Sequence, residues 1–203
     1  MKIIPFYARG WEANSYLAVC DGQAALIDAG ASAQAVCETL KKENAVLKYI
    51  ILTHGHFDHT VCADRLREMT GAALAIHMDD AEMLADAEKS ALALFFGRYD
   101  TVKDADILLK DGGSIQLGGE SITLIHTPGH SRGSSCFLVG DALFTGDTIF
   151  NGGYGRYDLH GGDADTLFAS LSSLKALDGE LDIYPGHGDT AKLKTALQYL
   201  NIL

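Results

Sequence analysis

Several residue types are scarce in this sequence. Its 203 residues include only three prolines, one tryptophan and four cysteines. No apolar stretch approaches the ~18–20 residues that a helix needs to cross a bilayer, so we expect no membrane segment. The modest length and the absence of a low-complexity linker predict a single domain that spans residues 1–203.

Positively charged residues are outnumbered. There are 16 Lys and Arg residues against 27 Asp and Glu residues, which gives a formal net charge of −11. An acidic surface repels phosphate backbones, so we expect no nucleic-acid partner. The overall charge does not describe a local site, because divalent metals would add positive charge where acidic residues are concentrated.

The cysteines are isolated from one another along the chain, at Cys20, Cys37, Cys62 and Cys136. They form no CxxC pair, which disfavours a soft-metal site. The N-terminus is too short and too strand-like for a signal peptide, so disulfides are not expected. We therefore expect reduced, mostly buried thiols and a cytoplasmic protein.

Alternating and continuous apolar patterns predict many short strands and fewer helices. Strands are expected at residues 16–19, 24–28, 49–53, 73–76, 114–117, 122–126, 135–139, 142–144 and 181–184. Helices are expected at 33–42, before Gly71, at 81–87, at 164–177 and at 192–200. The apolar run at 91–97 suits either a core helix or a mobile cover over a site. Many short strands followed by helices, twice over, predict two packed β-sheets with helices outside.

The most informative segment is His54-Gly55-His56-Phe57-Asp58-His59. It follows the apolar run at 49–53, so three imidazoles and one carboxylate leave a strand end together. A metal needs nitrogen and oxygen ligands that converge from a rigid support. A solvated loop or an artificial tag is the plainer alternative. Because Gly55 and Asp58 interrupt the histidines and the segment directly follows a strand, the sequence predicts a metal site.

Three later segments repeat the order of strand, glycine-containing turn and ligand-type residue. They are His126-Thr127-Pro128-Gly129-His130, Phe144-Thr145-Gly146-Asp147 and Ile183-Tyr184-Pro185-Gly186-His187-Gly188. Glycine lets the backbone turn sharply and approach other groups closely. Each segment alone is a weak signal, but together behind the first they strongly favour one shared site.

In this order the segments resemble the metallo-β-lactamase superfamily. The resemblance runs from the Ile27-Asp28-Ala29-Gly30 strand end to Pro185-Gly186-His187. It implies an α+β fold, a four-layer αββα sandwich of two mixed β-sheets flanked by helices. It also implies a site for two divalent metals at one edge of the sheets, with Asp28 bracing that site instead of ligating.

The resemblance also divides the candidate ligands. It implies that a first metal is bound by His54, His56 and His130, a second by Asp58, His59 and His187, and that Asp147 bridges the two. Zinc is the default for an imidazole-rich site, and iron or manganese also accept such ligands. Bound water then ionises near pH ~7 instead of ~15.7, so no serine or cysteine nucleophile is needed.

Asp147 points to one branch of the superfamily. Members that open β-lactam rings lack the bridging aspartate as a rule, so a β-lactamase is disfavoured. The pattern is similar to the glyoxalase II branch, which hydrolyses thioesters, and residues 155–163 resemble its short bacterial members except at Tyr157 and His160. The resemblance implies a hydroxyacylglutathione hydrolase-like thioesterase, in which a hydroxide held between two metals attacks the carbonyl of a small-molecule substrate and Asp58 helps to orient it.

Candidate substrate contacts lie in the glycine-rich loop after Asp147. Arg156 could contact a substrate carboxylate, although a structural ion pair suits it equally. The other candidates are Asn151, Tyr154 and His160. The chain ends at Leu203, soon after His187, so we expect no counterpart of the helical domain with which larger glyoxalase II enzymes grip glutathione.

Rival functions remain open at this point. A persulfide dioxygenase-like oxidoreductase with one iron, held by two histidines and an aspartate, resembles the same branch. A phosphodiesterase or nuclease is disfavoured by the net charge of −11. A non-catalytic metal-binding scaffold is disfavoured by the complete set of ligands. The sequence does not give the oligomeric state.

Overall fold

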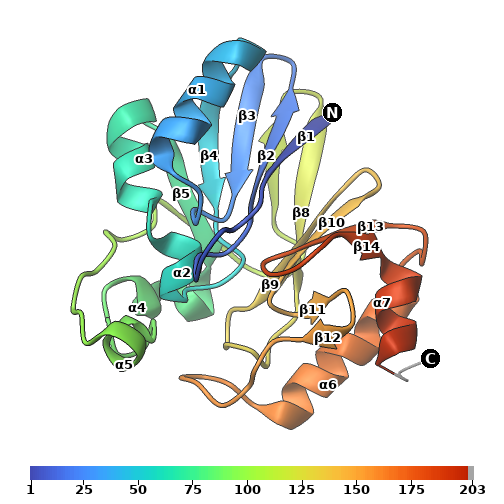
Figure 1. Cartoon of the computed structure of the whole chain (residues 1–203). Coiled ribbons are helices and arrows are strands. Elements are labelled where there is room, and N and C mark those ends of the chain that lie inside the picture. The colour runs from blue at the N-terminus through green and yellow to red at the C-terminus, as the bar shows by residue number, and fades with distance from the viewer. Residues whose placement is uncertain (201–203) are drawn as a thin grey trace.

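Figure 1 shows the computed structural model, which describes residues 1–200 as two packed β-sheets between helices. The first six-stranded sheet has the order β1 (Lys2–Phe6), β2 (Ser15–Cys20), β3 (Gln23–Ile27), β4 (Val46–Ile51), β5 (Ala73–His77) and β6 (Ile107–Leu109). The second has the order β14 (Ala191–Lys192), β13 (Asp182–Pro185), β10 (Ala142–Gly146), β9 (Ser135–Val139), β8 (Glu120–His126) and β7 (Ser114–Leu117). A small ribbon pairs β11 (Ile149–Phe150) with β12 (Gly153–Tyr154). Both large sheets mix parallel and antiparallel pairs.

Helices cover the outer face of each sheet (Figure 1). The first sheet carries α1 (Ala33–Glu43) and α3 (Ala63–Thr70), and the second carries α6 (Ala164–Ser173) and α7 (Leu193–Tyr199). Shorter elements are α2 (Phe57–Thr60), η1 (Met78–Asp80), α4 (Ala81–Leu84), α5 (Leu92–Phe96) and η2 (Leu174–Ala176). This is the four-layer αββα sandwich that the resemblance to the metallo-β-lactamase superfamily implies.

Strand β3 shows how the sequence builds these layers. Successive side chains of a strand point to opposite faces of the sheet. Ala24 and Leu26 pack toward the helices of the first sheet, whereas Ala25 and Ile27 pack between the sheets. Because both faces are buried, the strand is a continuous apolar run and not an alternating one.

The main differences from the sequence prediction lie at element ends. Strand β4 stops at Ile51 instead of residue 53, because the Thr53 N–H donates to Asp28 Oδ1 at 2.8 Å. Helix α4 stops at Leu84, whose carbonyl accepts from Val102 N, and α6 stops at Ser173 and tightens into η2. Strands of two or three residues, such as β6 and β11, carry too little pattern to predict.

No helix within residues 1–200 is long and apolar enough to cross a membrane.

The layer between the sheets gives a test of the packing. Phe137 is 1% exposed there, whereas Phe168 on α6 is 40% exposed. We expect Phe137→Ala to lower the free energy of unfolding by about 3–5 kcal/mol, because it leaves a cavity in a closed core. Phe168→Ala is the matched control and should cost about 1 kcal/mol or less. Equal losses in urea denaturation would contradict this packing.

Candidate metal centre

The candidate ligands follow strands whose carboxyl ends lie at one edge of the sandwich. Strands β3 and β4 run parallel, and so do β10 and β13. Strand β8 runs parallel to β10 because both are antiparallel to β9. The segments after β4, β8, β10 and β13 carry the candidates, which are His54, His56, Asp58 and His59, then His130, Asp147 and His187. Because these strands end at the same edge of the sandwich, candidate ligands that are far apart in the sequence lie close together.

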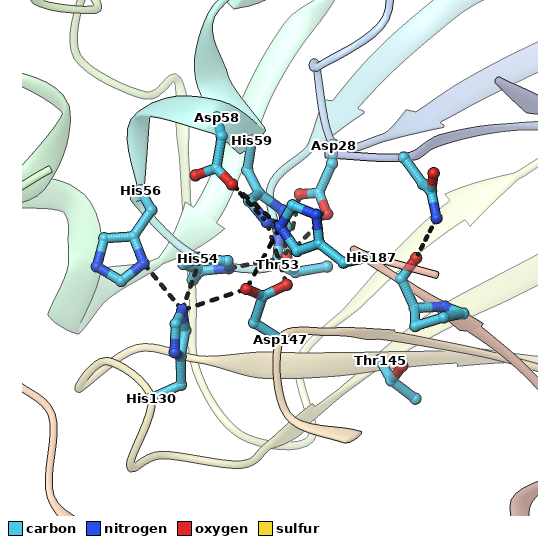
Figure 2. Close-up of polar contacts among 12 residues, drawn as sticks. Asp28, Thr53, His54, His56, Asp58, His59, His130, Thr145, Asp147 and His187 are labelled. Carbon is cyan, nitrogen blue, oxygen red and sulfur yellow. Dashed lines mark hydrogen bonds and ion pairs between the residues drawn. The ribbon is translucent and has the colours of Figure 1, made fainter. Parts of the chain in front are cut away.

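Three buried imidazoles form one group. His56 Nδ1 lies 2.9 Å from His130 Nε2, and His54 Nε2 lies 3.1 Å from the same atom. Figure 2 shows the three rings pointing their nitrogens at a common space. These residues are one of the sets whose donor atoms could hold a metal ion.

A second group lies beside the first. His187 Nε2 is 3.1 Å from Asp58 Oδ2, and His59 Nε2 is 3.8 Å from the same oxygen. Asp147 lies between the two groups (Figure 2). One of its oxygens is 3.2 Å from His59 Nε2, and the other is 3.6 Å from His130 Nε2 and also 3.6 Å from His187 Nε2. A single carboxylate is thus within reach of both groups.

Hydrogen bonds behind the rings determine which nitrogens carry protons. His130 Nδ1 donates to the Arg156 carbonyl at 2.6 Å, and His59 Nδ1 donates to Asp28 Oδ2 at 2.8 Å. Thr53 Oγ1 donates its proton to Asp28 and lies 3.1 Å from His54 Nδ1. Because the hydroxyl proton is already used, His54 Nδ1 is the donor to Thr53 Oγ1. Carbonyl and carboxylate oxygens only accept, so the Nε2 atoms of these three rings are unprotonated in their neutral form.

This arrangement fits bound cations. The lone pairs of His54 Nε2 and His130 Nε2 face each other across 3.1 Å in a buried space. His59 Nε2 and Asp147 Oδ1 also face this space, 3.2 Å apart, and neither buried atom makes a hydrogen bond of acceptable geometry. Buried polar atoms without partners are unfavourable. Divalent metals would satisfy the inward-facing nitrogens and the carboxylates, so the donor set suits such ions.

The electrostatics of the side chains agree with this fit. Burial, reinforced by the neighbouring His130, lowers the pKa of His56 to about 3, so its ring is neutral. Burial also works against a charge on His59, but Asp28, Asp147 and Asp58 outweigh it and raise the His59 pKa well above its usual value. Burial raises the pKa of Asp147, yet the facing His59 outweighs it and the net shift is downward. Asp147 therefore stays ionised and attracts positive charge.

Comparison with known proteins identifies the family. The sequence model of the metallo-beta-lactamase superfamily matches residues 8–187. The chain belongs to the metallo-β-lactamase superfamily. It is similar to the probable metallo-hydrolase YqgX of Bacillus subtilis, with 33% identity over 91% of this chain and 89% of the relative. It is also similar to the hydroxyacylglutathione hydrolase GloC of Haemophilus influenzae, with 30% identity over 81% of this chain and 80% of the relative.

Solved structures of the superfamily share the fold. The crystal structure of the BLEG-1 B3 metallo-beta-lactamase has a TM-score of 0.91 and 30% identity, over 97% of each chain. The structure of TTHA1623 in a di-iron-bound form has a TM-score of 0.83 and 31% identity, over 95% of this chain and 96% of that one. The chain is thus a member of a metallo-hydrolase superfamily whose typical cofactors are divalent metals.

Beside the ligand groups of this superfamily member lies a cavity of about 460 Å³. Its lining includes the candidate ligands His56, Asp58, His130, Asp147 and His187 and the aromatic residues Trp11, Phe57, Phe95, Phe96 and Phe150. Sequence reasoning noted the run at 91–97 without choosing its role. In the structure Leu92 is buried, whereas Phe95 and Phe96 of α5 line this cavity.

One of the four predicted substrate contacts lines the cavity. Arg156 does so, while its guanidinium pairs with Asp158 at 2.6 and 2.8 Å. Asn151 lies in the turn between β11 and β12, and the Tyr154 ring packs 5.3 Å from Phe168. His160 Nε2 lies 3.3 Å from Glu82 Oε1, outside the lining. That any of these four residues contacts a substrate stays a prediction.

A separate cluster of candidate ligands has a different geometry. His77, Asp79 and His126 have donor atoms close enough together to be considered for a metal. However, the two rings stack at 4.1 Å with an angle of 9° between their planes. Imidazole lone pairs lie in the ring plane, so stacked rings direct them along parallel lines. His126 Nε2 also lies 2.8 Å from the Arg132 carbonyl, which suits a structural role.

Asp28 gives a first test of the site. The resemblance implies that Asp28 braces the site, and its carboxylate contacts His59. Thr53, which could not be found from the sequence, links Asp28 to His54. Asp28→Asn keeps the shape, and asparagine tolerates the left-handed backbone at φ 58°. We expect roughly a 10–100-fold loss of metal affinity because the acceptor that orients His59 is weakened. The control is Asp141→Asn in the exposed β9–β10 turn, and an equal effect there would contradict the role.

Gly186 gives a second test. A Cβ added to this residue would overlap Asp147 Oδ1 and His59 Cε1. We expect Gly186→Ala to displace these side chains and to lower metal affinity roughly 10–100-fold, as disturbed ligand orientation does. Gly153→Ala is the matched control, since its Cβ would meet nothing closer than 3.8 Å. Metal titration measures both, and an unaffected Gly186→Ala protein would show that this close packing is not needed.

Proposed function

We propose that this chain is a metal-dependent thioester hydrolase, similar in reaction to the hydroxyacylglutathione hydrolases. The observation that carries the proposal is the pair of ligand groups that share Asp147. In this proposal His54, His56 and His130 hold one metal, Asp58, His59 and His187 hold the other, and Asp147 contacts both. Zinc is the first choice for so many imidazoles, and iron or manganese are also compatible.

The reaction adds water to a thioester and releases a carboxylic acid and a thiol. Two divalent ions held here would polarise the carbonyl and lower the pKa of a water molecule enough to supply hydroxide near neutral pH. The chain's part is to hold Asp58 beside that space, where its Oδ2 is 3.1 Å from His187 Nε2 and can accept a proton from the attacking water.

The cavity supports water as the nucleophile. Within the described residues, its lining contains no serine, threonine or cysteine side chain. Cys136 is fully buried in the second sheet, and burial raises the pKa of its thiol to about 11. A covalent intermediate on a protein hydroxyl or thiol therefore has no candidate residue at this site.

The choice of a thioester rests on two supports. Asp147 stands where the resemblance to the glyoxalase II branch requires a bridging carboxylate, and the similar GloC protein is named a hydroxyacylglutathione hydrolase. β-Lactam opening is a less favoured candidate: the BLEG-1 protein of similar fold is named a metallo-beta-lactamase, but members that open β-lactam rings as a rule lack the bridging aspartate that stands here as Asp147. The persulfide dioxygenase alternative requires a single iron and consumes oxygen.

The test is hydrolysis by purified protein whose metal content has been assayed. We expect metal-loaded protein to consume S-lactoylglutathione or another thioester, and chelated protein to lose the activity. A β-lactam and oxygen uptake with a persulfide are measured in parallel. Absence of thioester hydrolysis by protein with two metals bound would contradict the proposal, and activity on either parallel substrate would redirect it.

Removal of single ligands gives a sharper prediction. We expect Asp147→Ala and His56→Ala to lower both metal content and turnover, with turnover falling roughly 10²–10³-fold, as when one electrostatic stabiliser of a transition state is lost. Asp141→Ala is the control for the loss of a carboxylate. Normal turnover in the Asp147→Ala protein would exclude a bridging role for that carboxylate.

A further inference from the structure

Four aromatic side chains form a continuous surface beside the candidate metal centre. We call Trp11, Phe57, Phe95 and Phe96 the aromatic wall. Trp11 lies 5.3 Å from Phe57 and 5.1 Å from Phe96, measured between ring centroids. Phe57 lies 5.5 Å from Phe96 and 5.9 Å from Phe95. All four line the same cavity as the candidate ligands.

The aromatic wall is partly exposed to solvent and lies directly beside the candidate metal ligands. Trp11 is 40% exposed, Phe95 49% and Phe96 45%. Single exposed aromatics are common, but contiguous ones at the mouth of a cavity indicate a binding surface. Phe57 lies in the chain between the candidate ligands His56 and Asp58, so a group on this wall is next to the reacting bond.

Charge near the wall disfavours a polar anionic occupant. Among the described residues that line the cavity, Arg156 is the one arginine or lysine. Its guanidinium is already paired with Asp158 through both oxygens and lies 5.6 Å from the centre of the Phe95 ring. Glutathione carries two carboxylates, for which this lining offers no free pair of cations.

We propose that the aromatic wall binds an apolar group of the substrate that flanks the scissile thioester, so that the preferred thioesters are aliphatic or aromatic and not short and polar. This inference rests on the proposed thioester hydrolysis but names the substrate class. The apolar group is on either the acyl or the thiol side of the bond, and the two sides share the same chemistry. The test separates them.

The first experiment measures binding without turnover. Trp11 is the only tryptophan in the sequence, so intrinsic tryptophan fluorescence reports on the wall directly. Metal-loaded protein is titrated with acetate, butyrate, hexanoate and octanoate, and separately with alkyl thiols of matching lengths. We expect affinity to rise about two- to fourfold for each added methylene in at least one series, as partial burial of apolar surface predicts.

Matched variants on α5 locate the effect. Phe96→Ala and Phe95→Ala each remove part of the wall, whereas Leu94→Ala removes an apolar side chain of the same helix that is 69% exposed and outside the lining. We expect the phenylalanine variants to weaken the dependence on chain length and Leu94→Ala to leave it unchanged. Affinity that is independent of chain length, or equal effects of the three variants, would overturn the inference.

The second experiment measures kcat/KM for an acyl series on one thiol and a thiol series on one acyl group, with S-lactoylglutathione for comparison. A rise of kcat/KM with chain length in one series supports binding by the aromatic wall and shows whether the wall binds the acyl side or the thiol side. Hydrolysis with no such rise overturns the inference and leaves the proposed function standing. Chain-length-dependent binding without hydrolysis of any thioester supports the wall and overturns the proposed function.

Discussion

Unprotonated ligand atoms that face one another in a buried space are the constraint on which the rest of this structure depends. His54 Nε2 and His130 Nε2 lie 3.1 Å apart, and the other nitrogen of each ring is committed to an acceptor behind it. By itself such an arrangement is unfavourable, because a proton on His56 Nδ1, 2.9 Å from His130 Nε2, can satisfy that lone pair but leaves the lone pair of His54 Nε2 without a donor. The surrounding fold holds them in place, and a cation would convert repulsion into coordination.

The same region joins the two sheets. The Ser135 N–H of the second sheet donates to the Thr53 carbonyl at 3.0 Å, and the Asn14 N–H donates to the Gly186 carbonyl at 2.7 Å. The Asn14 amide also donates to the Pro185 carbonyl at 3.1 Å. Candidate ligands from both sheets are therefore fixed relative to one another by polar contacts as well as by the core. This rigidity suits chemistry that depends on ligand position.

Much of the fold and of the site could be predicted from the sequence, for identifiable reasons. Buried strands are continuous apolar runs, and glycine turns mark their ends, so the segments at His54, His130, Asp147 and His187 could be recognised. Thr53 could not, because its role depends on a side-chain contact across to Asp28. The aromatic wall was also missed, since Trp11 meets α5 only through the tertiary fold. No sequence pattern shows that His56 presents Nδ1 while His130 presents Nε2.

The central claim is that this edge of the sandwich holds two metals that share one carboxylate. Anomalous diffraction from crystals of the protein loaded with zinc tests it most directly. The account predicts two peaks, one among His54, His56 and His130 and the other among Asp58, His59 and His187, with Asp147 in contact with both. A single peak, or an Asp147 carboxylate that contacts only one metal, would contradict it.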